Sequence, residues 1–153
     1  MTVLAAMRPD SWNFPLLVHA FGAMLLVGGL FASAGITATA RRDVGFLRLG
    51  YWALLAVALP GWVIMRIGAQ WIYNKEGWDE LPDDLIPDWL GIGFFAADVG
   101  GLVLLVSLIV GGIGVYRLRT GGGAGLLRAT LVLSVILLAA YVVAVWAMSG
   151  KPG

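Results

Sequence analysis

Three ionisable residues stand inside long apolar runs of the sequence, and they mark where chemistry is possible: His19, Arg66 and Asp98. Charged side chains at membrane depth are costly, so they usually face the interior of a helix bundle and pair with one another. Counted from the nearer ends of their runs, all three lie five to seven residues in, as does Tyr141 in the last run. At about 1.5 Å of rise per residue, the four positions fall roughly 8–11 Å below one boundary. We therefore interpret them as one polar layer.

This layer has a structural and a functional interpretation. In the structural one, Arg66 and Asp98 form a buried ion pair that fixes helix register, and His19 hydrogen-bonds Tyr141 or Asp98. In the functional one, the layer is a binding site. His19 then binds a haem iron or another metal, or carries a proton, and Arg66 holds an anionic group such as a propionate. Gly22 lies one turn from His19 and leaves space beside its ring.

Four apolar runs must position these residues. A bilayer core of roughly 30 Å takes about 20 apolar residues in a spanning helix. We predict spanning helices over residues 14–38, 50–72, 91–115 and 126–148 of a single domain, 1–153. Short loops join antiparallel neighbours, so the expected fold is all-α, a polytopic up-down four-helix bundle. Pro60 and Gly61 predict a kink in the second helix.

Small residues also recur at helical spacing within the runs. Such ridges let helix backbones approach closely in lipid. The positions are Gly29 and Ser33 in the first run, and Gly93, Ala97 and Gly101 in the third. We interpret these ridges as packing surfaces.

The composition excludes several classes of protein. Hydrophobic residues make up 60% of the 153 residues and charged residues 12%, with a mean hydropathy of +0.91. Soluble domains average about 45–50% apolar and about 25% charged residues. An ordinary soluble globule, a disordered chain and a nucleic-acid binder are therefore excluded. The chain has no cysteine and one histidine, which excludes disulfides, thiolate metal sites and His-rich metal centres.

The distribution of charge predicts an orientation in the membrane. Lys and Arg accumulate on the cytoplasmic side. Six arginines flank the two short loops: Arg41, Arg42, Arg48, Arg117, Arg119 and Arg128. The loop 73–90 carries six acids against Lys75, so its net charge is 1 − 6 = −5. We expect the short loops to be cytoplasmic and this outer loop and both termini to be extracytoplasmic, as in a bacterial inner membrane. The outer loop also holds Trp78 and Trp89, which fit an interfacial aromatic belt.

The first helix resembles a recurrent pattern of small membrane proteins. The segment LLVHAFGAMLLVGGLF places His19 near the helix start, followed by the pair Gly28 and Gly29. This is similar to the histidine and Gly-Gly signature around the copper-resistance D family and the HemJ-type protoporphyrinogen oxidases. It also resembles uncharacterised four-helix integral membrane families. The resemblance implies that His19 binds haem b and that the two glycines pack the helix.

The chain departs from that pattern in its other donors. Leu26 and Val27 stand where a tryptophan often precedes the glycine pair, and no lysine lies within the four predicted helices. A single histidine excludes bis-histidine ligation within one chain. Met65 or Met148, both in the outer half of their helices, is the candidate for a second axial ligand. Copper chemistry is disfavoured, because the chain has no cysteine and no methionine cluster.

The sequence is compatible with three functions. The first is a membrane binding protein with haem b or another small ligand at His19. The second is a structural or accessory subunit of a larger membrane complex, or of a homo-oligomer, without a cofactor of its own. The third is a membrane oxidoreductase of HemJ type. One histidine and no cysteine is a thin catalytic inventory, so the sequence favours a binding or accessory role over an enzyme.

Overall fold

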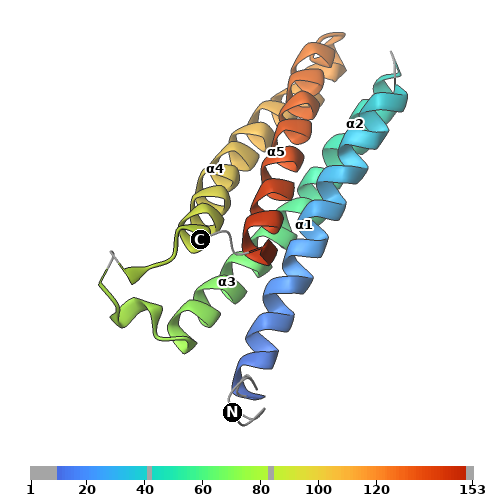
Figure 1. Ribbon diagram of the computed structural model, residues 1–153. Helices are drawn as coiled ribbons and strands as arrows, with labels where there is room; N and C mark the ends of the chain where they lie inside the picture. The colour runs from blue at the N-terminus through green and yellow to red at the C-terminus, as the bar shows by residue number, and fades with distance from the viewer. Residues whose placement is uncertain (1–9, 41–42, 83–84, 151–153) are drawn as a thin grey trace.

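The computed structural model of the chain describes residues 10–40, 43–82 and 85–150, and the regular elements of this part are all helices, joined by short turns (Figure 1). Its segments are η2 (Asp10–Trp12), α1 (Asn13–Ala40), α2 (Val44–Ala53), η3 (Leu54–Ala58), α3 (Leu59–Lys75), η4 (Trp78–Glu80), α4 (Asp88–Arg117), η6 (Leu118–Thr120) and α5 (Ala124–Gly150). Four stretches are long and apolar enough to cross a membrane: Asp10–Ile36, Val44–Lys75, Asp88–Thr120 and Ala124–Gly150. The prediction of four helices of spanning length is confirmed.

The second spanning stretch begins six residues earlier than predicted, at Val44 instead of residue 50. Asp43 is its N-cap, and the Asp43 carboxylate accepts a hydrogen bond from the backbone N–H of Gly45 at 2.7 Å. Such a cap satisfies a donor that the first turn of a helix leaves unpaired. Arg48 therefore lies within α2, where the sequence had placed it in the loop.

The sequence predicts a kink at Pro60, and the structure has a π-helical turn just before it, over Leu54–Ala58. The Leu59 N–H donates to the Leu54 carbonyl, five residues back. Proline lacks an N–H, and its ring crowds the carbonyl four residues earlier. A widened turn relieves that crowding.

Helices α1 and α3 pack through glycines that recur every seven residues in both. Gly22 and Gly29 lie on α1, and Gly61 and Gly68 on α3. Each faces backbone on the other side of this contact: Met65 of α3, Ala58 of the preceding η3, and Leu26 and His19 of α1, respectively. A Cβ on Gly29 would lie 2.6 Å from the Ala58 nitrogen, whereas Gly28 has open space around it. Of the pair that the resemblance implied, Gly29 packs against Ala58 of η3, whereas Gly28 packs against no described neighbour.

Helices α4 and α5 pack differently, because small residues on α4 face large residues on α5. The pairs are Gly93 with Met148, Gly100 with Tyr141, and Gly114 with Leu127. The ridge predicted at Gly93, Ala97 and Gly101 is divided between two neighbours. Gly101 lies against the Trp62 ring of α3, and the Ala97 carbonyl accepts a 2.8 Å hydrogen bond from Trp62 Nε1. Residues spaced four apart lie on a row that winds gradually around the helix axis. One row of small residues can therefore contact two neighbouring helices.

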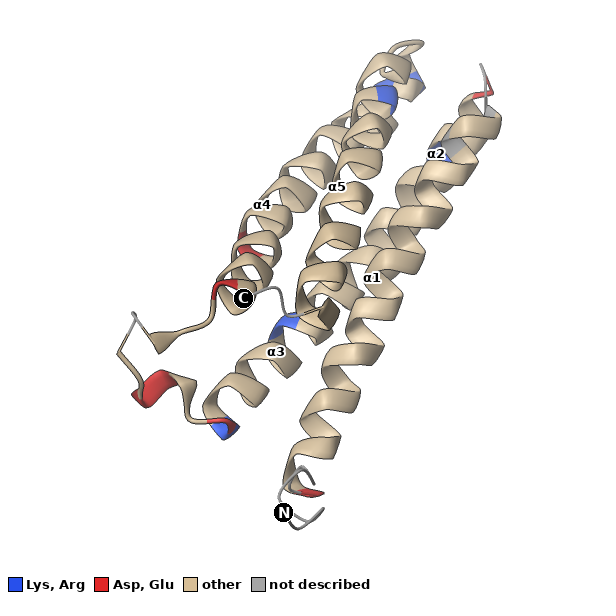
Figure 2. Cartoon of the chain, in the orientation of Figure 1, with Lys and Arg blue, Asp and Glu red and all other residues tan. Residues whose placement is uncertain are grey.

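The two ends of the bundle differ in charge (Figure 2). Arg117, Arg119 and Arg128 lie at the end where α4 passes to α5, which we call the basic end. The opposite, acidic end holds the turns between α3 and α4, the start of α1 and the end of α5. Arg41, Arg42, Asp83 and Asp84, which also entered the charge argument, lie outside the described residues.

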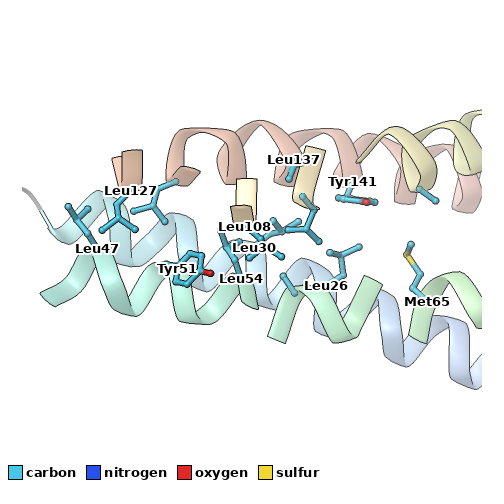
Figure 3. Close-up of a cluster of buried hydrophobic side chains, with 14 residues drawn as sticks. Leu26, Leu30, Leu47, Tyr51, Leu54, Met65, Leu108, Leu127, Leu137 and Tyr141 are labelled. Atoms are coloured by element: carbon cyan, nitrogen blue, oxygen red, sulfur yellow. The ribbon is translucent and has the colours of Figure 1, made fainter. Parts of the chain in front are cut away.

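The core toward the basic end is filled with leucine and a few hydroxyls (Figure 3). Its completely buried leucines are Leu30, Leu47, Leu54, Leu104, Leu127 and Leu131. Ser33 and Ser134 are completely buried as well, and their hydroxyl oxygens lie 3.3 Å apart across α1 and α5. The Ser134 hydroxyl also donates to the Leu131 carbonyl at 2.7 Å. Buried polar groups at this depth are thus paired, as a low-dielectric interior requires.

Candidate functional site

A cavity of about 550 Å³ lies in the half of the bundle nearer the acidic end, lined by α1, α3, α4 and α5. Four of the candidate residues line it: His19, Met65, Tyr141 and Met148. Most of the remaining lining is alanine, glycine and aliphatic side chains. Figure 3 shows Met65 and Tyr141 at one end of the buried cluster, away from Leu47 and Leu127. The structure therefore brings together side chains from three segments that are distant in sequence.

His19 is held against α3 because Gly68 has no side chain where the His19 backbone passes. Its Nδ1 lies 3.1 Å from the Met65 carbonyl oxygen. A carbonyl oxygen only accepts, so Nδ1 carries the hydrogen in this contact. In the neutral ring, Nε2 then has a lone pair. A carbonyl on one ring nitrogen is the usual support for a histidine whose other nitrogen binds a metal or accepts a hydrogen bond.

Tyr141 projects from α5 and is 3% exposed. Its ring fits opposite Gly100, where a Cβ would lie 2.6 Å from the hydroxyl oxygen. The buried hydroxyl has no hydrogen-bond partner among the described residues. The structural interpretation expected His19 to bond Tyr141 or Asp98, and His19 is bonded to the Met65 carbonyl instead. An unsatisfied buried hydroxyl costs about 1–3 kcal/mol, so it needs an explanation.

Arg66 and Asp98 form an ion pair outside the cavity. The Arg66 Nε donates to Asp98 Oδ1 at 2.9 Å, and the guanidinium carbon lies 4.9 Å from the centre of the Phe94 ring. The side chains are 28% and 57% exposed, so the pair lies at the surface, where the sequence interpretation had buried it. Neither residue lines the cavity. Successive helix residues point about 100° apart, so with Met65 facing inward Arg66 points away.

A second cavity of about 210 Å³ adjoins the first toward the turns between α3 and α4. Four residues line both cavities: His19, Ala69, Phe94 and Met148. The smaller one is also lined by Tyr73, Glu76, Trp78 and Trp89. Sequence reasoning had assigned the two tryptophans to an interfacial belt and Glu76 to a solvated acidic loop. The signal that could have found them is the clustering of the aromatic residues Tyr73 and Trp78 with the acidic residue Glu76 in one short segment.

The end of α3 positions these residues. The Glu76 N–H donates to the Ile72 carbonyl at 2.8 Å, and Gly77 follows with a φ of 72°. A residue just after a helix often takes this left-handed conformation, which glycine adopts without strain. The chain thereby turns back, and Trp78 Nε1 donates to Glu76 Oε2 at 2.6 Å. The Tyr73 hydroxyl donates to the Trp78 carbonyl at 3.3 Å.

The described residues that line the cavities could coordinate the iron of haem b, but they offer no cationic partners for its two propionate carboxylates. His19 is a suitable axial ligand, and Met65 and Met148 place thioethers in the same cavity. Among the described residues, no Lys or Arg lines either cavity, and Arg66, the predicted propionate partner, points elsewhere. Glu76 adds a negative charge to the adjoining space. Two buried carboxylates without a cation are unfavourable, so the site does not fit haem b as a whole. In the described part of the chain, no three His, Cys, Asp or Glu side chains gather as metal ligands.

Comparison with protein-family models, curated proteins and solved structures gives no match to this chain. The resemblance of the first helix to the HemJ-type and copper-resistance D families is thus an expectation from the sequence alone.

Proposed function

We propose that this chain is a multi-pass membrane protein that binds a small, mainly apolar ligand between its helices. The observation that carries the proposal is the cavity lined by both His19 and Tyr141, beside which the buried Tyr141 hydroxyl has no hydrogen-bond partner among the described residues. Ligand sites are typically apolar pockets of about 300–1,000 Å³ with a few convergent polar groups. A polar atom of the ligand would complete the hydrogen bonding of Tyr141.

The chemistry of the lining defines the class of ligand. His19 Nε2 and the Tyr141 hydroxyl can each hydrogen-bond a polar group, and the rest of the cavity offers apolar contact. The absence of Lys and Arg from the described lining disfavours an anionic ligand. Neither side chain is paired as a nucleophile with a base, which supports binding as the function in preference to catalysis.

The orientation is part of the same proposal. The arginines at the basic end support a cytoplasmic location for that end by the positive-inside rule. The cavities then lie in the extracytoplasmic half of the membrane, in a setting such as a bacterial inner membrane. A ligand could reach them from the outer leaflet or from the space beyond it.

Filling the cavity tests the proposal. Ala144 lines it and is 8% exposed, so Ala144→Phe places a ring in the ligand space. Ala139, on the same helix, is exposed, and Ala139→Phe is the matched control. A long-chain alkanol added to the purified protein should raise the Tm of the wild type and the control, because a ligand of the folded state stabilises it. We expect little effect on Ala144→Phe. Equal shifts in all three proteins would contradict a ligand site in this cavity.

An absorption spectrum of the purified protein, before and after dithionite, tests haem separately. For protein expressed with an ample haem supply, we expect no Soret band, because the described lining of the cavity holds no cation for the propionates. A Soret band that His19→Ala abolishes would instead identify His19 as an axial ligand. That result would replace the apolar ligand with haem b.

A further inference from the structure

We infer that the two cavities form one site for a cationic amphiphile, with its apolar chain in the larger cavity and an ammonium head in the smaller. The inference rests on the proposed binding function of the larger cavity and adds the charge class of the ligand. It starts from the continuity of the two spaces. His19, Ala69, Phe94 and Met148 line both, so a single molecule can occupy them together.

The walls of the smaller cavity are rich in aromatic rings. Tyr73, Trp78, Trp89 and Phe94 come from three segments, α3, η4 and α4. The rings of Trp78 and Trp89 meet edge to face with centroids 6.5 Å apart, as do those of Tyr73 and Phe94 at 5.2 Å. Edge-to-face pairs present ring faces in different directions, which is how aromatic cages surround an ammonium group. Phe94 already attracts one cation, since the Arg66 guanidinium lies against its ring.

The charge of the smaller cavity also favours a cation. Glu76 is its one acidic lining residue among those described, and no Lys or Arg lines it. One Glu76 oxygen accepts the Trp78 indole N–H at 2.6 Å, which fixes the carboxylate beside the rings. Within the described chain, Glu76 has no ion-pair partner, because the ion pair there joins Arg66 and Asp98. A carboxylate without a counter-ion among aromatic faces is complementary to an ammonium head group.

The position of the two cavities suits an amphiphile. The larger one is lined mainly by apolar residues of the spanning helices, whereas the smaller one lies under the turn where α3 ends. Aromatic and acidic side chains are typical of the membrane–water boundary and beyond it, where a head group would lie. The acidic residues Asp79, Glu80 and Asp88 at this end add a negative potential that attracts cations.

The test compares two probes of equal chain length, an alkyltrimethylammonium ion and an alkanol, on the full-length protein in lipid nanodiscs. We expect wild-type protein to bind the ammonium probe about tenfold more tightly than the alkanol, within the range of cation–π and charge contacts in a partly desolvated site. Glu76→Gln keeps an oxygen to accept the Trp78 N–H and removes the charge. This variant should lose the preference for the cation while binding the alkanol as before. Glu80→Gln removes one charge from an exposed residue outside both cavities and should keep the preference.

The outcomes separate this inference from the proposed function. If Glu76→Gln and Glu80→Gln lower ammonium affinity equally, the attraction comes from the general charge of the loop, and the inference is overturned. If the two probes bind wild-type protein equally and Ala144→Phe blocks both, the protein has an apolar ligand site without a preference for a cationic head group. That result overturns the inference and keeps the proposed function. If Ala144→Phe blocks neither probe, the proposed function itself fails. Unchanged alkanol binding by Glu76→Gln also shows that the variant is folded.

Discussion

The two halves of the bundle are built from equivalent helix positions but filled differently. Three leucines of the half nearer the basic end have an alanine seven residues away, on the same helix face, in the acidic half. The pairs are Leu30 with Ala23, Leu104 with Ala97, and Leu137 with Ala144. The leucines are 0–3% exposed in a filled core, whereas all three alanines line the larger cavity. The difference teaches that the cavity follows from small side chains at core positions of three helices at once.

The comparison also separates stability from function. In the filled half, the hydroxyls of Ser33 and Ser134 are bonded to each other. In the hollow half, the Tyr141 hydroxyl has no partner among the described residues. Interiors normally pack to the density of organic crystals and satisfy their polar groups. The half with a cavity and one unsatisfied hydroxyl is the part of the molecule where a ligand would supply the missing contacts.

Making the filled half resemble the hollow one should give the largest effect. Leu104 is completely buried, and Leu104→Ala should destabilise the protein by about 2–5 kcal/mol through lost contacts and a new cavity. Reversible unfolding in mixed micelles measures this free energy. Leu102→Ala, at a 63% exposed position of the same helix, should have little effect. Equal losses at both positions would show that the leucine core is not the main source of stability.

The opposite exchange should stabilise the protein by less. Ala144→Leu gives position 144 the same residue as Leu137, seven positions earlier on the same helix. Cavity filling of this kind commonly adds about 0.5–2 kcal/mol to the free energy of unfolding. The same unfolding measurement should show a gain for ligand-free protein, with no gain for Ala139→Leu at an exposed position. A loss at Ala144 would mean that the surrounding helices cannot accept a larger side chain there, and the contrast between the halves would then not be one of unused space.

The smallest change in stability is expected from removing the hydroxyl oxygen of Tyr141. Tyr141→Phe removes a buried hydroxyl without a described partner, so ligand-free protein should gain about 1 kcal/mol of stability while binding of the alkanol weakens. Tyr116 is 70% exposed, and Tyr116→Phe should change neither quantity. Thermal unfolding with and without the alkanol measures both. A marked loss of stability in ligand-free Tyr141→Phe would show that the hydroxyl is already satisfied, which would remove the main support for the ligand.

Much of the architecture could be predicted because the apolar residues are concentrated in four long runs of the sequence. The four runs contain too many consecutive apolar residues for a soluble domain, so four helices of spanning length followed without tertiary information. Their ends were less predictable, since Asp43 caps α2 at Val44 within what had been taken as a loop. The candidate residues His19, Met65, Tyr141 and Met148 were also identified, because polar and thioether groups in apolar runs are few.

Which residues lie at a common level of the bundle follows from their positions along the chain, because a helix has a fixed rise per residue. Only the tertiary structure decided which of them share a space. That depends on how each helix is rotated toward its neighbours, and the rotation is set by contacts such as Gly68 with His19 and Gly100 with Tyr141. Tyr141 therefore points into the cavity with His19, while Arg66 and Asp98 pair on the outer surface.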